Sequence, residues 1–222
     1  TAVTTAIIVV PTPINASFIV KNPLCNGEAN GSIDLIPSGG AYPYTFVWSS
    51  GQVTEDLSNI GDGTYIVTIT DSRGCSKVDS AELVEPGAIF TSGFIKNVSC
   101  NGNKDGFIDI TAYGGTLPYY FAWSNGPTTE DVGNLEGNDY YVTVTDANGC
   151  QAVSLYVVAE PAPLVVQLVA TSVSCFGSCD GRVAVVPSGG SKPYEYLWNN
   201  FSDDSLQTGV CAGQYTVLLT DS

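Results

Sequence analysis

The sequence predicts an all-β protein made of tandem 75-residue repeats, each a small β-sandwich. Thr, Val, Ile and Tyr crowd short segments that Gly (24 residues) and Pro (12 residues) separate, which is the composition of strands and turns. Trp occurs at positions 48, 123 and 198, so the spacing is constant and sets a 75-residue period. A fixed period of this length indicates a repeat architecture.

The same period runs through the cysteines and the turn residues. Residues 25–86 match residues 100–161 at 28 of 62 positions without a gap. The recurring landmarks are Cys25, Cys100 and Cys175, Cys75 and Cys150, the Gly-Gly pairs that begin at 39, 114 and 189, the Pro-Tyr pairs that begin at 43, 118 and 193, Tyr65, Tyr140 and Tyr215, and Asp71, Asp146 and Asp221.

Proline places the repeat boundaries. Glu-Pro closes two repeats at Pro86 and Pro161, and Pro11 lies one 75-residue period before Pro86. The next cysteine of the series would fall at position 225, so we expect the sequence to be a window on a longer array. The expected units are the last strand of a preceding repeat (1–11), two full repeats (12–86 and 87–161) and a repeat lacking its last strand (162–222).

Each repeat is predicted to contain strands and turns only. In the first repeat the expected strands are 18–20, 32–37, 44–48, 64–70 and 77–84. Hairpin-type turns are expected before the second strand, at Asn30-Gly31, Asp105-Gly106 and Asp180-Gly181. The segments 71–74 and 146–149 are expected to turn the penultimate strand into the last one.

Alternation assigns the core. Tyr65, Val67 and Ile69 share one face of a strand, and Tyr44 and Trp48 share a face of another. About seven short strands, a central Trp and a Tyr at the start of the penultimate strand are typical of an immunoglobulin-like sandwich.

The frame of residues resembles the SprB-type repeat over nearly all of 12–222. The first repeat carries it as CNGEANG (25–31), GGAYPY (39–44), WSSG (48–51), YIVTITDSRGC (65–75) and EP (85–86). The resemblance implies a very large cell-surface adhesin of a gliding Bacteroidota species, exported by the type IX system. The third repeat departs from the pattern, since Asn199-Asn200-Phe201 replaces the Ser-x-Gly turn and Cys179 and Cys211 are extra.

Charge and composition exclude several classes of function. Seven basic against 22 acidic residues give a net charge of −15, which disfavours binding to nucleic acid or to an anionic membrane surface. No apolar run approaches the roughly 18 residues of a membrane span. There is no His, the commonest general base and metal ligand.

We expect no catalytic site and no cofactor. The acidic pair Glu55-Asp56 recurs as Glu130-Asp131 but becomes Ser205-Leu206 in the third repeat, which indicates solvated faces and turns. The Cys-x-x-x-Cys spacing at 175–179 stands without His, so it does not predict zinc. Calcium stays open, because Asp105, Asp109 and Asp146 offer oxygen ligands, although we expect these residues to form turns.

The cysteines predict disulfides in an oxidising compartment. Two pairings compete: Cys25–Cys75 and Cys100–Cys150 inside repeats, or Cys25–Cys150 between neighbouring repeats. In a seven-strand sandwich Cys25 and Cys75 lie at opposite poles, roughly 20 Å apart, which favours the staple between repeats. The same reasoning places Cys179 and Cys211 at one pole, where they can pair inside the third repeat.

Two further features concern the surface. Asp79-Ser80-Ala81 and Asp204-Ser205-Leu206 match the O-glycosylation pattern that the resemblance implies, with Ser80 and Ser205 as acceptors. Tyr119-Tyr120 and Tyr140-Tyr141 could stack on sugars, but alternation puts one Tyr of each pair on the core face.

The predicted function is that of structural stalk repeats in an extracellular, cell-surface adhesin filament that projects an adhesive tip and bears traction in gliding or attachment. The expected partners are neighbouring repeats of the same chain. The alternatives are that the repeats bind surface polysaccharides multivalently or serve as accessory modules of a secreted hydrolase. Exposed aromatic rows recurring at the 75-residue period would favour binding, and their confinement to the core would favour the stalk.

Overall fold

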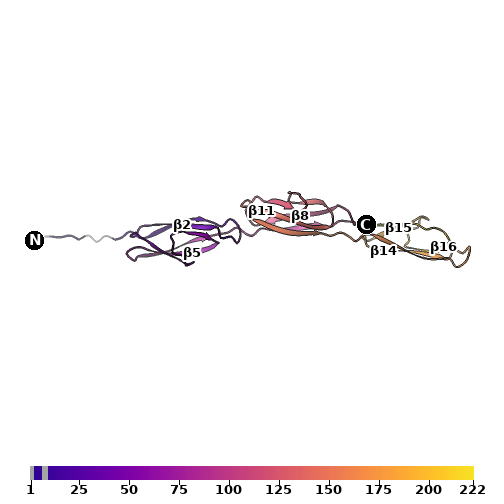
Figure 1. Cartoon of the computed structure of the whole chain (residues 1–222), viewed down its shortest axis with the longest axis horizontal. Helices are drawn as coiled ribbons and strands as arrows, with labels where there is room; N and C mark the ends of the chain where they lie inside the picture. Colours follow the sequence, from indigo (N-terminus) through magenta and orange to yellow (C-terminus); the bar gives the residue numbers. More distant parts are fainter. Residues whose placement is uncertain (1–2, 7–9) are drawn as a thin grey trace. The chain divides into compact units, whose positions relative to one another are not determined.

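The computed structural model describes residues 3–6 and 10–222, and these residues form strands and turns (Figure 1). No helix in the described part of the chain is long and apolar enough to span a membrane. The protein is all-β, with tandem immunoglobulin-like repeats at the 75-residue period.

The strands recur with the sequence period. The first repeat contains β1 (Asn15–Lys21), β2 (Gly31–Ser38), β3 (Thr45–Trp48), β4 (Leu57–Ile60), β5 (Gly63–Thr70) and β6 (Ser76–Leu83). The second contains β7 (Phe90–Lys96), β8 (Gly106–Tyr113), β9 (Tyr120–Trp123), β10 (Val132–Leu135), β11 (Asn138–Thr145) and β12 (Gln151–Val158). The third contains β13 (Val165–Thr171), β14 (Gly181–Ser188), β15 (Tyr194–Trp198), β16 (Leu206–Val210) and β17 (Val217–Asp221).

Contacts divide the chain into two compact units. The first unit comprises Thr1–Phe90, Tyr113–Tyr119 and Thr145–Ala152, and the second comprises Thr91–Ala112, Tyr120–Val144 and Val153–Ser222. The first unit therefore holds the first sandwich together with two turn segments of the second repeat.

Each full repeat is a six-stranded sandwich. The sheets of the first repeat have the orders β1-β2-β4 and β3-β5-β6, and the second repeat has the corresponding orders β10-β8-β7 and β12-β11-β9. This is the ABE and CFG arrangement of a constant-type immunoglobulin domain without its D strand. The expectation of about seven strands is therefore wrong by one, because only eight residues separate β3 from β4 and leave no room for a further strand.

The core lies between the two sheets of each sandwich. In the first unit Trp48 is 2% exposed, Val67 and Ile69 are fully buried, and Tyr44 and Tyr65 pack against the cluster. The indole N–H of Trp48 donates to the carbonyl oxygen of Thr54 at 2.9 Å, so the buried ring leaves no unpaired donor. Val67 and Ile69 lie on the face that the alternation predicts.

The turn predicted at Asn30-Gly31 is wrong. The chain turns earlier, where the N–H of Glu28 donates to the carbonyl of Cys25 and Gly27 has a φ of +75°. The side chain of Asn30 accepts a hydrogen bond from the N–H of Leu24 at 3.0 Å, so Asn30 closes the loop instead of turning a hairpin. Gly31 begins β2, at a place where a Cβ would collide with the Leu83 side chain.

The same assignment is wrong in the other repeats. The side chains of Asp105 and Asp180 accept hydrogen bonds from the N–H groups of Ser99 and Ser174, both at 3.0 Å. The turns after β5 and β11 lie where they were predicted. For the strand predicted in 1–11, residues 1–2 and 7–9 lie outside the described residues, and residues 3–6, 10 and 11 are in no strand.

Candidate functional site

A disulfide in the first unit joins two repeats. Cys25, in the loop after β1, is bonded to Cys150, in the turn between β11 and β12, with Cα atoms 5.6 Å apart. The sequence separation is 125 residues, one period plus 50. Of the two pairings that spacing leaves open, the structure contains the one between repeats. We call this bond the staple.

Strand direction explains why Cys25 does not meet Cys75. β1 is antiparallel to β2, and β5 is antiparallel to β3, which follows β2 after a tight turn. The ends of β1 and β5 therefore lie at opposite poles of the sandwich, about 25 Å apart for strands of this length. A disulfide requires Cα atoms at about 6 Å.

The linker to the second repeat holds the Cys25 loop. The Oε1 atom of Glu85 accepts a hydrogen bond from the Nδ2 of Asn26 at 2.5 Å, and its Oε2 accepts one from the N–H of Gly27 at 2.6 Å. Asn101 and Glu160 repeat the pairing at 3.1 Å. This clamp was not predicted from the sequence, although Asn26 and Glu85 recur at the 75-residue period as Asn101 and Glu160.

A buried aspartate holds the Cys150 turn. Asp146 is 2% exposed, and its Oδ1 accepts the N–H groups of Asn148 and Cys150, both at 2.9 Å. Its Oδ2 accepts the N–H of Thr116 at 2.8 Å. One carboxylate thus fixes the turn that carries the cysteine, as the recurrence of this Asp predicts.

Asn148 continues this turn into the first repeat. Its Nδ2 donates to the carbonyl oxygen of Leu24 at 3.0 Å and lies 3.1 Å from the Oγ1 of Thr116. The residue next to the stapled Cys25 is therefore also held by a hydrogen bond from the second repeat.

The equivalent aspartate of the first repeat makes the same bonds. Asp71 accepts the N–H groups of Arg73 and Cys75 at 2.9 Å and of Ala41 at 3.0 Å. Burial alone would raise the pKa of Asp71, but the three backbone donors and the Arg73 charge outweigh it and hold the pKa below its ordinary value of 3.8.

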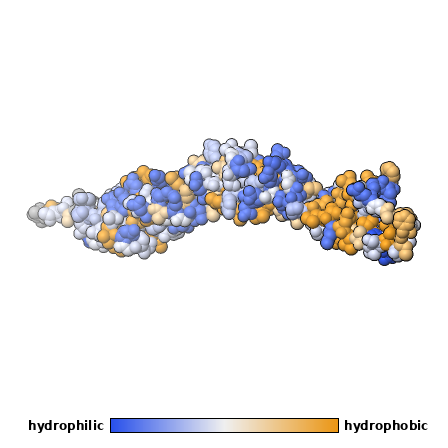
Figure 2. All heavy atoms as spheres, turned by 45° about the vertical axis from the view of Figure 1, so that its right-hand side comes forward, coloured by the Kyte–Doolittle hydropathy of each residue, from blue (hydrophilic) through white to orange (hydrophobic). Residues whose placement is uncertain are grey.

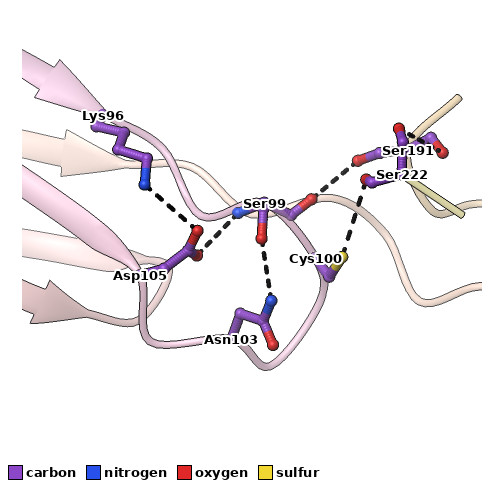
Figure 3. A network of polar contacts seen from close by, with 7 residues as sticks. All are labelled: Lys96, Ser99, Cys100, Asn103, Asp105, Ser191 and Ser222. Carbon is purple, nitrogen blue, oxygen red and sulfur yellow. Dashed lines mark hydrogen bonds and ion pairs between the residues drawn. The ribbon is translucent and has the colours of Figure 1, made fainter.

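In the second unit Ser99 is the counterpart of Leu24 and again accepts a hydrogen bond from the next repeat. The Oγ of Ser191 donates to the carbonyl oxygen of Ser99 at 3.0 Å (Figure 3). The thiol of Cys100 lies 3.9 Å from the carbonyl oxygen of Ser222.

Asp105 closes the loop that carries these contacts. It accepts the N–H of Ser99 at 3.0 Å and pairs with Lys96 at 3.5 Å, as Figure 3 shows. The Ser99 bond, with a further contribution from the Lys96 charge, lowers the pKa of Asp105 against the effect of burial. Asp105 therefore has a structural role.

The remaining cysteines divide into one pair and three thiols. Cys179 and Cys211 form a disulfide inside the third repeat, with a sequence separation of 32. Cys75, Cys100 and Cys175 have no sulfur partner among the described residues.

No group of three or more Cys, Asp or Glu side chains that could hold a metal ion occurs in the described part of the chain. Asp56 and Asp131, one from each recurrent acidic pair, accept the backbone N–H groups of Leu35 and Ile110, both at 3.0 Å. In the third repeat the equivalent N–H group, that of Val185, donates instead to the backbone carbonyl oxygen of Ser205.

The recurrent aromatic side chains serve the fold. The hydroxyls of Tyr44, Tyr119 and Tyr194 donate to the carbonyls of Gly39, Gly114 and Gly189, and those of Tyr65, Tyr140 and Tyr215 donate to the carbonyls of Gly61, Glu136 and Cys211. Tyr120 and Tyr141 are exposed, as alternation predicts, but the equivalent positions elsewhere are not aromatic. The proposed glycosylation acceptors, Ser80 on β6 and Ser205 before β16, are both exposed.

Known structures of tandem immunoglobulin domains are similar to the chain. A three-domain fragment of titin, in a glutamate-to-alanine variant, has 12% identity and a TM-score of 0.39 over 96% of this chain and 95% of that chain. An eight-domain fragment of the Down syndrome cell adhesion molecule has 10% identity and a TM-score of 0.38 over 84% of this chain and 37% of its own. An amphioxus IgVJ-C2 molecule has 15% identity and a TM-score of 0.27 over 68% of this chain and 98% of that chain.

Fold and junction together define a class: an array of immunoglobulin-like modules with a covalent bond between neighbours. The family model of the SprB repeat matches three segments, 17–53, 92–128 and 168–202. The chain carries three SprB repeats, one in each sandwich. No curated protein matches it.

Proposed function

We propose that the chain is a stalk segment of an extracellular, cell-surface adhesin, without enzymatic activity of its own. The observation that carries this proposal is the staple. It joins the start of one sandwich to the end of the next and encloses the 124 residues between Cys25 and Cys150. A pulling force at the chain ends then passes through the disulfide and bypasses most of both sandwiches.

The distribution of aromatic residues supports the same function. Trp48, Trp123 and Trp198 recur with the period and are at most 4% exposed. The exposed Tyr120 and Tyr141 occur once each and do not repeat. A multivalent polysaccharide-binding array requires the same exposed residues in every unit, so the pattern favours a spacer over a receptor.

Binding assays distinguish the two functions. The oxidised chain is applied to a panel of polysaccharides and to glass, with and without calcium, beside a Tyr120→Ala, Tyr141→Ala variant. A stalk segment shows no saturable binding under either condition. Saturable binding that the double variant loses would move the adhesive function into the repeats, and calcium dependence would assign an ion to it.

Gliding traction, type IX export and O-glycosylation are further parts of the proposal. An intact mass above that of the polypeptide, with the excess lost in a Ser80→Ala, Ser205→Ala variant, is the result expected for glycosylation at these acceptors. A mass equal to the bare polypeptide in material from the native host would contradict it.

A further inference from the structure

The last strand of the second repeat is an edge strand without a charged residue. In the sheet order β12-β11-β9, β12 lies on the outside, so one of its backbone edges has no strand beside it in the described part of the chain. Its sequence, QAVSLYVV, contains no charged side chain. Edge strands of native sheets are usually protected by charges, which oppose pairing with another chain.

The first repeat contains the protected form of the same strand. β6 has the sequence SKVDSAEL, with three charged residues, Lys77, Asp79 and Glu82. Lys77 and Asp79 form an ion pair at 3.6 Å and lie on the same side of the strand as the buried Ala81 and Leu83. Inward-pointing charges of this kind are a known protection of sheet edges. The residues of β12 at the three charged positions are Ala152, Ser154 and Val157.

The backbone groups of alternate residues point to the open edge of β12. Just beyond the strand, the N–H of Ala159 donates to the Oδ1 of Asn97 at 3.0 Å, and its carbonyl accepts the N–H of Val98 at 3.2 Å. These groups point away from β11. Residues at two-residue intervals before Ala159 direct their backbone groups to the same side. They are Val157, Leu155 and Val153.

The neighbouring strand β7 leaves this edge accessible. β7 belongs to the other sheet, where it pairs with β8. It contacts β12 through a side chain: the Oγ1 of Thr91 donates to the Oγ of Ser154 and accepts the hydroxyl of Tyr156, both at 2.7 Å. Ser154 and Tyr156 lie on the inward side of β12, so β7 covers the inner face of the strand and not its edge.

The outer face beside the open edge is apolar. Val153, Leu155 and Val157 are 64%, 49% and 51% exposed. The register that sets Ile66 opposite Ser80 in the first repeat sets Tyr141, also exposed, beside Leu155. Over the first two repeats the face shown in Figure 2 is mostly hydrophilic, so an exposed apolar group of this size requires an explanation.

The pattern of β12 is complementary to itself. When two copies of the strand pair antiparallel about a two-fold axis at Leu155, the two Leu155 side chains meet and Val153 of each copy meets Val157 of the other. The three pairs exchange about six main-chain hydrogen bonds, which supply affinity in strand addition.

Charge also favours a second copy as the partner. Among the outward positions of β9, β11 and β12, Asp139 is the only charged residue. A basic or acidic partner therefore finds few charges to pair with on this face. Two copies of the face bring together apolar side chains, and the net charge of −15 on each chain opposes the contact only from a distance.

We propose that β12 is a pairing edge, to which β12 of a second copy of this chain adds antiparallel. The two three-stranded sheets then form one continuous sheet across the two-fold axis. The contact uses the same surface on both copies, so it closes at a dimer. This lateral association goes beyond the proposed stalk function, which does not require it.

Sedimentation velocity of the oxidised chain from roughly 5 to 500 µM tests the proposal. A Cys75→Ser, Cys100→Ser, Cys175→Ser background prevents disulfides between copies. We expect a monomer–dimer equilibrium without larger species, and a shift toward the dimer on addition of salt, because salt screens the repulsion between the two negative chains.

The first repeat provides a matched control. Val153 and Val78 occupy the same position in β12 and β6 and are 64% and 58% exposed. Val153→Glu should weaken the dimer about tenfold or more, whereas Val78→Glu, with the same change in charge, should alter it by less than about threefold. Leu155→Ser, Val157→Glu, which copies the residues of β6, should also weaken the dimer about tenfold or more.

Cross-linking tests the register of the pair. In the same background, Val153→Cys and Val157→Cys chains should form a disulfide-linked dimer when they are mixed, because opposed Cα atoms in such a pair lie about 5.5 Å apart. Either variant alone should cross-link at least about tenfold more slowly, since its two cysteines are about 14 Å apart.

Three results would overturn the proposal: a monomer at every concentration, equal effects of Val153→Glu and Val78→Glu, or single variants that cross-link as fast as the mixture. Dimers that Val153→Glu leaves unchanged would also overturn it. They would place the contact elsewhere, for example on the hydrophobic residues that Figure 2 shows gathered over the third repeat.

Discussion

Removing the staple should release a defined length of chain under tension. In the oxidised protein, once β1 and β12 have detached from β2 and β11, a force applied at the two chain ends passes from Cys25 through the disulfide to Cys150, so the residues between the two cysteines bear none of it. At about 3.4 Å per extended residue, the 124 enclosed residues correspond to about 420 Å of contour length.

Single-molecule force spectroscopy, with handles at both ends, measures this length. The Cys25→Ser, Cys150→Ser variant should extend about 420 Å further than the oxidised chain before the final rise in force. The Cys179→Ser, Cys211→Ser variant calibrates the measurement, because that disulfide encloses only 31 residues, or about 105 Å.

A Cys75→Ser variant distinguishes the staple from a bond inside the first repeat. With Cys25 bonded to Cys150, this substitution leaves the extension of the oxidised chain unchanged. With Cys25 bonded to Cys75, it would release the 49 residues between them, about 170 Å. Release on Cys75→Ser, or an unchanged extension in the Cys25→Ser, Cys150→Ser variant, would refute the mechanical argument.

Three further predictions concern stability. In a Cys179→Ser, Cys211→Ser background, reduction of the Cys25–Cys150 bond should lower the free energy of unfolding by about 5 kcal/mol on the chain-entropy model, measured by denaturant titration with and without reductant. A loss near zero would show that the bond does not constrain the unfolded chain. Asp146→Ala should cost about 3 kcal/mol, because it leaves three buried N–H groups without an acceptor, and Asp146→Asn, which retains one oxygen, should cost less in the same titration. Because the folded state lowers the pKa of Asp71 below 3.8, its carboxylate stabilises the fold above about pH 4, and this contribution is lost as pH falls through the lowered pKa. The free energy of unfolding should therefore decrease less between pH 6 and pH 2 in Asp71→Asn than in the unsubstituted chain. An equal decrease in both proteins would contradict the assignment.

Period and alternation predicted the sandwich well, because both are properties of single strands and single repeats. Val67 and Ile69 are buried where alternation places them. β4 (Leu57–Ile60) was not predicted, since its four residues contain no alternation and Asn59 adopts a positive φ of 55°. The strand is defined by its pairing with β2, which a local pattern does not contain.

The junction was less accessible to sequence reasoning. The 75-residue period of the cysteines is compatible with a bond within a repeat and with one between repeats, and strand direction favoured Cys25–Cys150. The contacts around the bond followed from no local rule: Asn148 reaches the carbonyl of Leu24 across 124 residues of sequence. Dipeptide preference misassigned Asn30-Gly31 because the demand on Gly31 comes from the Leu83 side chain on a distant strand.

The offset of the staple also bears on how such genes change in length. The Cys25–Cys150 bond involves only a repeat and its successor, because it joins the loop after the first strand of one to the last turn of the next. Unequal recombination that inserts or removes whole 75-residue units therefore preserves this pairing wherever the equivalents of Cys25 and Cys150 both recur. Arrays of very different length can then oxidise by one pairing rule, without any mutation at a cysteine codon.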